Sequence, residues 1–143
     1  MTRIHDLSFL TRTRVSSTFY EDLEHKVRAL VSPQNMIRDF VIPGMPHAEN
    51  YKIDFKLESR DPETPLFLFG IPNNEKAKLT ALIIEHWLRA NVSFDSLLVF
   101  ADQTKVSRQD VARLSNVGGE MVSSLDAVDD LKRKLLKRVA QHA

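Results

Sequence analysis

A run of six residues, Leu66 to Ile71, constrains the fold of this chain more than any other feature. Its first four residues, Leu66-Phe67-Leu68-Phe69, are apolar at every position. A continuous apolar run of this length is typical of a strand that is covered on both faces, and therefore of a central strand in a sheet. Pro72 follows the run and is expected to end the strand, because proline cannot donate a hydrogen bond to a neighbouring strand.

A second strand is predicted just before this run, because apolar and polar residues alternate from Tyr51 to Leu57. The alternation predicts that one face carries only apolar side chains: Tyr51, Ile53, Phe55 and Leu57. Asp54 would then point away from the apolar layer. Because the stretch between the two strands is polar and contains Pro62, we expect a turn there and an antiparallel hairpin.

Strands and helices alternate through the rest of the chain. A strand over residues 96–101 is expected to run parallel to the central strand, because a long helix connects the two. The first expected element is a helix from about residue 17 that ends before Pro33, and strands over 36–42, 51–57 and 66–71 follow it. Next come a helix capped by Asn73 or Asn74 that ends near Asn91, and the strand over 96–101. The last elements are a short helix opened by a capping box over 107–110, a strand over 120–123, and a final helix that begins near Ser124 or Asp126.

Two of these helices are predicted to be amphipathic. The long helix after the central strand is expected to bury this stripe: Leu79, Leu82, Ile83, Trp87 and Ala90. The final helix is expected to bury a second stripe: Val128, Leu131, Leu135 and Val139.

Length and pattern together predict one mixed α/β (α+β) domain of three layers, with a central mixed sheet of about five strands and helices on its faces. A chain of 143 residues with 43% hydrophobic residues has room for one sizeable core but not for two ordinary domains. Residues 1–16 show little periodicity and are predicted to be an N-terminal arm. The domain then covers residues 17–143, in which 103–143 extends a core formed by 17–102.

Composition excludes several classes of protein. With 20 Lys and Arg against 19 Asp and Glu, the net charge of +1 produces no overall field that would attract a polyanion. The absence of cysteine excludes disulfides and thiolate zinc sites, and the five histidines show no metal-ligand spacing, so no cofactor is indicated. No apolar run has the length of a membrane span, and we expect a cytoplasmic protein without a membrane partner.

The order of elements over residues 17–102 is similar to the core of the restriction-endonuclease-like PD-(D/E)xK superfamily. That resemblance implies metal-dependent cleavage of phosphodiester bonds, with a first acid on one strand and a second acid and a lysine, two residues apart, on the next strand. Asp54 matches the first position. The next strand, residues 66–71, has neither an acid nor a lysine, so the chain departs from the second motif of the superfamily.

A second resemblance covers about residues 36–125. Three segments, Lys52-Ile53-Asp54-Phe55, the apolar strand over 65–71, and Val99-Phe100-Ala101-Asp102, are similar to a family of small domains of unknown function that phages, plasmids and other mobile elements carry. This resemblance implies a mobile-element protein and brings no established activity.

Glu75 and Lys76 lie just past the strand that lacks the second motif, in the first turn of the long helix. If the catalytic pair has moved to this helix, Asp54, Glu75 and Lys76 would form the catalytic set, with Asp54 as a ligand of Mg²⁺. A simpler alternative is that Asp54 belongs to a solvated strand face between two lysines. Glu75 is likewise favoured by the helix dipole without any metal.

Basic residues gather on the final helix, where Lys132, Arg133, Lys137 and Arg138 are candidates for contacts with nucleic-acid phosphates. An ordinary solvated helix face predicts the same residues. Lysine and arginine near a helix C-terminus are also favoured by the helix dipole.

These patterns favour a non-catalytic protein of a mobile element that binds nucleic acid or a host or mobile-element protein on a nuclease-like scaffold, in defence or counter-defence. One alternative is a metal-dependent nuclease that uses Asp54 with Glu75 and Lys76. Its acids must lie within about 8 Å of each other to share a cation whose oxygen ligands sit about 2.1 Å away. Another alternative is an accessory subunit that recognises only protein, which an exposed apolar patch would favour.

Overall fold

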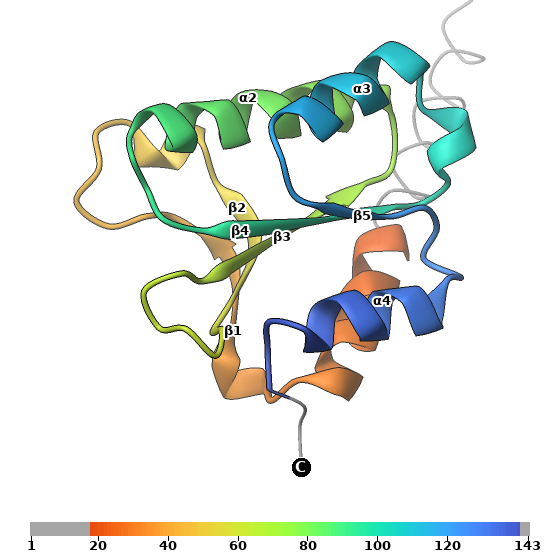
Figure 1. The fold of residues 1–143 in the computed structure, drawn as a ribbon, viewed down its shortest axis with the longest axis horizontal. Helices are drawn as coiled ribbons and strands as arrows, with labels where there is room; N and C mark the ends of the chain where they lie inside the picture. The colour runs from red at the N-terminus through yellow and green to blue at the C-terminus, as the bar shows by residue number, and fades with distance from the viewer. Residues whose placement is uncertain (1–17, 141–143) are drawn as a thin grey trace, which may run out of the picture.

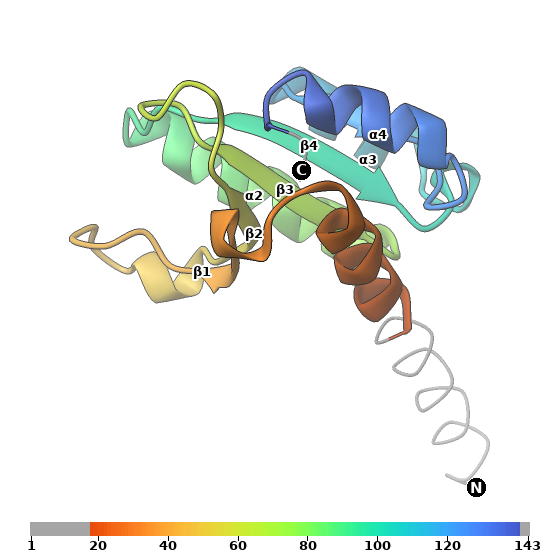
Figure 2. The same cartoon turned by 90° about the horizontal axis from the view of Figure 1, so that it is seen from below.

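The computed structural model describes residues 18–140, which form three layers with a sheet between two pairs of helices (Figure 1). The predicted N-terminal arm, residues 1–16, lies outside the described residues. One face of the sheet is covered by a helix over residues 18–30 and by α4 (Val128–Leu136), and the other by α2 (Asn74–Arg89) and α3 (Arg108–Asn116) (Figures 1 and 2). The mixed α/β domain with helices on both faces is therefore confirmed.

Five strands form the sheet, and they lie side by side in chain order: β1 (Met36–Phe40), β2 (Ile53–Leu57), β3 (Leu66–Ile71), β4 (Asp95–Phe100) and β5 (Glu120–Val122). Strand β2 is antiparallel to both of its neighbours, β1 and β3, whereas β3, β4 and β5 are parallel. In the register, Leu68 of β3 lies between Phe55 of β2 and Leu97 of β4. Both the predicted hairpin and the predicted parallel crossover are confirmed.

The connections contain three short 3-10 turns, at Pro33–Asn35, Ala48–Asn50 and Gln103–Lys105. Helix α3 begins at its N-cap, Ser107, as predicted, and the Asp110 N–H donates to Ser107 Oγ at 3.2 Å. The predicted capping box is only half formed, because the Ser107 N–H donates to Asn74 Oδ1 at 2.8 Å, and the Asp110 carboxylate accepts from Ser107 Oγ instead. These contacts satisfy hydrogen-bonding groups that the first turn of a helix otherwise leaves free.

Strand β3 is the centre of the domain, as its composition predicts, because all six of its residues are buried. Its side chains alternate between two cores. Leu66 and Leu68 pack under the helix over residues 18–30 and α4, whereas Phe67, Phe69 and Ile71 pack under α2 and α3. Each large apolar side chain buried in this way contributes about 1.5–3 kcal/mol to the stability of the fold.

The predicted stripe on α2 is partly wrong. Leu79 and Leu82 are 47% and 55% exposed, although Ile83 and Trp87 are buried as expected. The helix instead turns small side chains toward the domain, with Ala77 and Ala81 each 1% exposed. Small residues on the inner face let a helix approach its neighbours closely, and α2 packs against both β3 and α3.

The predicted stripe on α4 is wrong at one position. Val128, the first residue of the helix, is 43% exposed, whereas Leu131, Leu135 and Val139 are fully buried.

Strand β2 also departs from its predicted faces. Ile53 packs in the core under α2, whereas Phe55 and Leu57 pack in the core under the helix over residues 18–30. The backbone is irregular at this point, because Asp39, which lies between the β1 partners of Ile53 and Phe55, has a φ of 51°. The Asp54 side chain, which lies in this part of β2, is 20% exposed.

Candidate functional site

Asp54 lies at the point where β2, β3 and the start of α2 meet. Its Oδ2 atom accepts a hydrogen bond from the Gly70 N–H at 2.9 Å and one from the Lys76 ammonium at 2.5 Å. The Asp54 side chain is only 20% exposed. A partly buried carboxylate needs such partners, because loss of hydration is costly unless charge and hydrogen bonds compensate for it.

Lys76 reaches this point from the first turn of α2, which Asn73 caps by accepting a hydrogen bond from the Lys76 N–H at 3.0 Å. The Lys76 ammonium donates to Asp54, to the Tyr20 hydroxyl at 2.8 Å and to the Gly70 carbonyl at 3.2 Å. An ammonium group has three N–H donors. All three are therefore engaged within the protein.

Tyr20 brings the helix over residues 18–30 into the same cluster. Its hydroxyl also lies 3.2 Å from the Gly70 carbonyl, and its ring lies 5.0 Å from the Lys76 ammonium. Gly70 permits this close approach, because a Cβ atom there would lie 2.8 Å from Phe19 and 3.0 Å from Tyr20. We call Tyr20, Asp54, Gly70 and Lys76 the corner cluster.

The electrostatics of the corner cluster follow from these contacts. Burial alone would lower the pKa of Lys76, but the Asp54 charge and the hydrogen bonds to Asp54 and Tyr20 outweigh it, so the pKa is raised. Burial raises the pKa of Tyr20, although the nearby Lys76 charge opposes the change. At neutral pH the ammonium is therefore charged and the phenol is neutral.

Of the three residues predicted to form a catalytic set, the structure brings Asp54 and Lys76 into contact. Glu75 is exposed on α2, and its side chain makes no hydrogen bond or ion pair with any residue from 18 to 140. Within the same range, no three His, Asp or Glu side chains are grouped closely enough to hold a metal ion. The arrangement can hold a charge pair, but the described residues do not complete a metal site.

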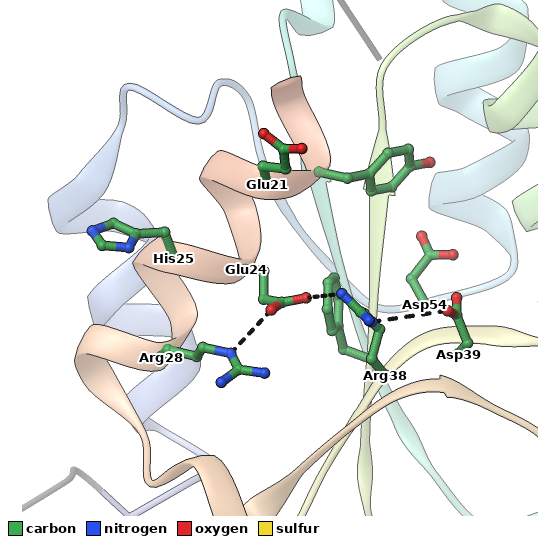
Figure 3. Close-up of a pocket in the computed structure, with 9 residues that line it drawn as sticks. Glu21, Glu24, His25, Arg28, Arg38, Asp39 and Asp54 are labelled. Carbon is green, nitrogen blue, oxygen red and sulfur yellow. Dashed lines mark hydrogen bonds and ion pairs between the residues drawn. The ribbon is translucent and has the colours of Figure 1, made fainter. Parts of the chain in front are cut away.

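A cavity of about 580 Å³ opens beside Asp54, between the helix over residues 18–30 and strands β1 and β2. Its walls combine acids, bases and two aromatic rings: Tyr20, Glu21, Glu24, His25, Arg28, Arg38, Asp39, Asp54 and Phe55. Figure 3 shows the Glu24 carboxylate between two guanidinium groups. We call this space the helix–sheet cavity.

Glu24 organises the charges in the helix–sheet cavity. One of its oxygens lies 3.1 Å from Arg28 Nε and the other 3.1 Å from Arg38 Nη1. The Arg38 Nε atom also lies 4.0 Å from the Asp39 carboxylate (Figure 3). Glu24 is 19% exposed, whereas Arg28 and Arg38 are 50% and 64% exposed. Glu24 thus positions both guanidinium groups, which remain exposed to solvent.

Sequence reasoning missed the role of Glu24, Arg28 and Arg38. The pairing of Glu24 with Arg28 has a local signal, because residues four positions apart lie on the same face of a helix. The contact between Arg38 and Glu24 has none, because it joins a strand to a helix through the packing of the domain.

The four basic residues predicted to bind nucleic acid lie at the end of the chain, and three of them are paired with acids. Arg133 lies 2.6 Å from Asp130, Lys137 lies 2.8 Å from Glu120, and Arg138 lies 2.9 Å from Asp95. In the part of the chain that the structure describes, Lys132 is exposed and has no acidic partner.

Asp102 and His86, which lie outside the corner cluster, have local structural roles. Asp102 accepts hydrogen bonds from the Thr104 N–H and hydroxyl, which lower the pKa of its carboxyl, and it thereby caps the turn that follows β4. The His86 ring stacks on Tyr51 with 3.7 Å between ring centres, and Trp87 donates a hydrogen bond to the Tyr51 carbonyl.

No family model, curated protein or solved structure matches the chain. None of the helices in residues 18–140 combines the length and the apolar character needed to cross a membrane.

Proposed function

We propose that this protein is a non-catalytic nucleic-acid-binding protein of the mobile-element kind that its sequence resembles. The observation that carries the proposal is that the Lys76 ammonium is fully engaged by Asp54, Tyr20 and Gly70. A lysine that assists phosphodiester cleavage needs a donor free to reach the phosphate in the transition state. Here the ammonium ties four elements of the fold together, and the cluster stabilises the scaffold.

The corner cluster contains Asp54 but no second acid, and this also supports a non-catalytic protein. Mg²⁺ is usually held by one or two carboxylates together with substrate phosphates, in near-ideal octahedral geometry. Asp54 Oδ2 is already occupied by Lys76 and Gly70, and Glu75 is not engaged with the corner cluster. A scaffold similar to the restriction-endonuclease-like core would then bind nucleic acid without cutting it, in defence or counter-defence between a mobile element and its host.

Nucleic acid is the proposed ligand because the domain exposes basic groups, among them the guanidinium groups of Arg28 and Arg38 and the ammonium group of Lys132, which has no acidic partner in residues 18–140. Guanidinium groups are well suited to phosphate, since their planar donors match two oxygens at once.

Binding of a fluorescein-labelled 20-nucleotide duplex and of its single strands, measured by anisotropy across a series of NaCl concentrations, tests the proposal. We expect the logarithm of the association constant to fall linearly with the logarithm of the salt concentration, because bound phosphates release counterions. We also expect the labelled strand to stay intact in the presence of Mg²⁺. Absence of binding, or binding that salt does not weaken, would contradict the proposal.

Absence of binding would instead favour an accessory protein that recognises another protein. The surface to test in that case is the outer face of α2, where Leu79 and Leu82 are exposed one turn apart.

A metal-dependent nuclease is the second candidate, and one observation favours it. In residues 18–140, no hydrogen bond or ion pair engages the Oδ1 atom of Asp54, and Asp54 lines the same cavity as Glu21 and Glu24. A cleavage assay with Mg²⁺ or Mn²⁺ tests this candidate. Cleavage that disappears in Asp54→Ala would replace our proposal with the nuclease, whereas cleavage that persists would remove Asp54 from the mechanism.

A further inference from the structure

We infer that two copies of this chain associate through the outer face of α2, with the two helices antiparallel about a twofold axis near Leu82. The inference goes beyond the proposed function and does not depend on nucleic-acid binding. Helix α2 lies on the outside of the molecule, in the layer that covers one face of the sheet (Figure 1).

The centre of this face is apolar. Leu79 and Leu82 are 47% and 55% exposed, although leucine is among the residues that proteins most often bury. One turn further along the helix, the half-buried His86 ring stacks on Tyr51. Exposed apolar side chains that adjoin one another on one helix face are typical of a contact surface, whereas ordinary surfaces carry them singly.

The spacing of the residues on this face suits the packing of two helices. Five residues of α2 follow one another at alternating steps of four and three positions: Glu75, Leu79, Leu82, His86 and Arg89. This spacing places them on a single stripe along the helix, as in helices that pair lengthwise. Lys78 and Glu85 lie beside the stripe.

The charges on the two sides of the leucines are complementary to themselves. Glu75 and Lys78 precede the leucines along the helix. Glu85 and Arg89 follow them, so the same order of signs occurs twice. In an antiparallel pair, Glu75 lies opposite Arg89 of the second copy, and Lys78 lies opposite Glu85 of the second copy. A twofold axis produces each contact twice, whereas parallel helices would place each charge opposite its like.

These charged groups are available to a second copy. In residues 18–140, neither Glu75 nor Lys78 takes part in an ion pair, and both are exposed. Arg89 is 81% exposed and lies 4.0 Å from Glu85, which is too far for a hydrogen bond. A second copy can therefore contact all four charges without breaking a short ion pair within the chain.

The size of the surface sets the expected strength. Helix α2 has 16 residues and is therefore about 24 Å long. A single pair of helices of this length covers less surface than the about 1,200–2,000 Å² of a stable interface, so we expect a weak dimer that forms only at high protein concentration.

Sedimentation velocity of the full chain, without nucleic acid and over a series of protein concentrations, tests the inference. We expect the weight-average mass to rise from that of a monomer toward that of a dimer as the concentration increases. Leu82→Glu brings two carboxylates together at the twofold axis, so this variant should stay monomeric at every concentration. Leu88→Glu is the matched control and should associate as the unmodified protein does. Leu88 is 47% exposed on the same helix but lies about 120° around the helix axis from Leu82.

Exchange of two charges tests the antiparallel arrangement. Lys78→Glu should raise the dissociation constant at least about tenfold, because two carboxylates then face each other at both ends of the interface. Addition of Glu85→Lys should restore the original affinity. Lys78 and Glu85 lie about two turns apart on the helix, so the restoring contact must form between copies rather than within one chain.

This exchange keeps the test valid if Leu82→Glu does not fold. A monomer at every concentration, unchanged association of folded Leu82→Glu, or a double variant that associates no more strongly than Lys78→Glu would each overturn the inference. The proposed function would be unaffected in all three cases, because these measurements contain no nucleic acid.

Discussion

The Lys76 ammonium lies 2.5 Å from Asp54 Oδ2, and both side chains are mostly covered, at 14% and 20% exposure. The contact joins the start of α2 to β2, and through Tyr20 and Gly70 it also engages the helix over residues 18–30 and β3. A charge pair in this position holds four elements in register. Loss of one partner leaves the other, mostly covered charge without compensation.

Lys76→Met is therefore expected to lower the free energy of unfolding by about 2–3 kcal/mol, because it leaves the Asp54 carboxylate partly buried and unpaired. Urea denaturation followed by circular dichroism measures the change. Lys78→Met, at an exposed position on the same helix, is the matched control and should change stability by less than about 0.5 kcal/mol. Equal effects of the two substitutions would show that the corner cluster does not stabilise the fold.

Alkaline pH should weaken the same cluster. The pKa of Lys76 is raised above its ordinary value of 10.5, and the pKa of Tyr20 above 10.0. A group whose pKa is raised on folding contributes stability that is fully present below its unfolded pKa and is lost as pH rises through its folded pKa. We expect unfolding free energy to fall above about pH 10, and to fall less in Lys76→Met than in the unmodified protein. A parallel decline in both proteins would contradict this assignment.

Alanine substitutions at two neighbouring glycines distinguish the effect of steric crowding from that of backbone strain. Gly118 and Gly119 have φ values of +99° and +93°, so alanine is strained at both positions. A Cβ atom at Gly118 would meet nothing within 4 Å, whereas one at Gly119 would lie 2.2 Å from Ser96 Oγ and 2.8 Å from the Ser96 carbonyl oxygen. Gly118→Ala should cost about 1 kcal/mol and Gly119→Ala about 2–4 kcal/mol. Thermal unfolding compares them, and equal costs would rule out the predicted crowding at Ser96.

The outer face of α2 can be tested for its part in folding. Leu82 is 55% exposed, so in dilute protein, where the proposed dimer is dissociated, Leu82→Gln should change the unfolding free energy by no more than about 0.5 kcal/mol. Ile84, in the same helix, is 1% exposed, and Ile84→Ala should cost about 2–5 kcal/mol through lost burial and a new cavity. Chemical denaturation of both variants measures the difference. A large loss in Leu82→Gln would mean that this side chain is covered even in dilute protein.

Local sequence pattern predicted most of the elements correctly. The unbroken apolar run in β3, the caps at Asn73 and Ser107, and the alternation of strands and helices all reflect interactions within a few residues of the chain. The inward face of α2 was predicted less well. Leu79 and Leu82 are more hydrophobic than Ala77 and Ala81, but the space between α2 and its neighbours suits the smaller side chains.

The candidate site was likewise predicted only in part from the sequence. The sequence indicated that Asp54 and Lys76 belong to one site, and the structure joins them. It carried no signal for Tyr20, which lies 56 residues from Lys76 along the chain, or for the approach of Arg38 to Glu24 across 14 residues. Such contacts depend on how a helix docks on a sheet, and the pattern of apolar and polar residues within each element does not predict that docking.

By itself, the sequence determined the order of strands and helices, the central place of β3 and the mixed α/β class, because burial periodicity and capping act between near neighbours in the chain. The tertiary structure alone decided that the Asp54 and Lys76 charges compensate each other, and that Arg28 and Arg38 converge on Glu24. The physical reason is that the strength of a charge interaction depends on distance and on exclusion of water, and both arise only when distant segments pack together.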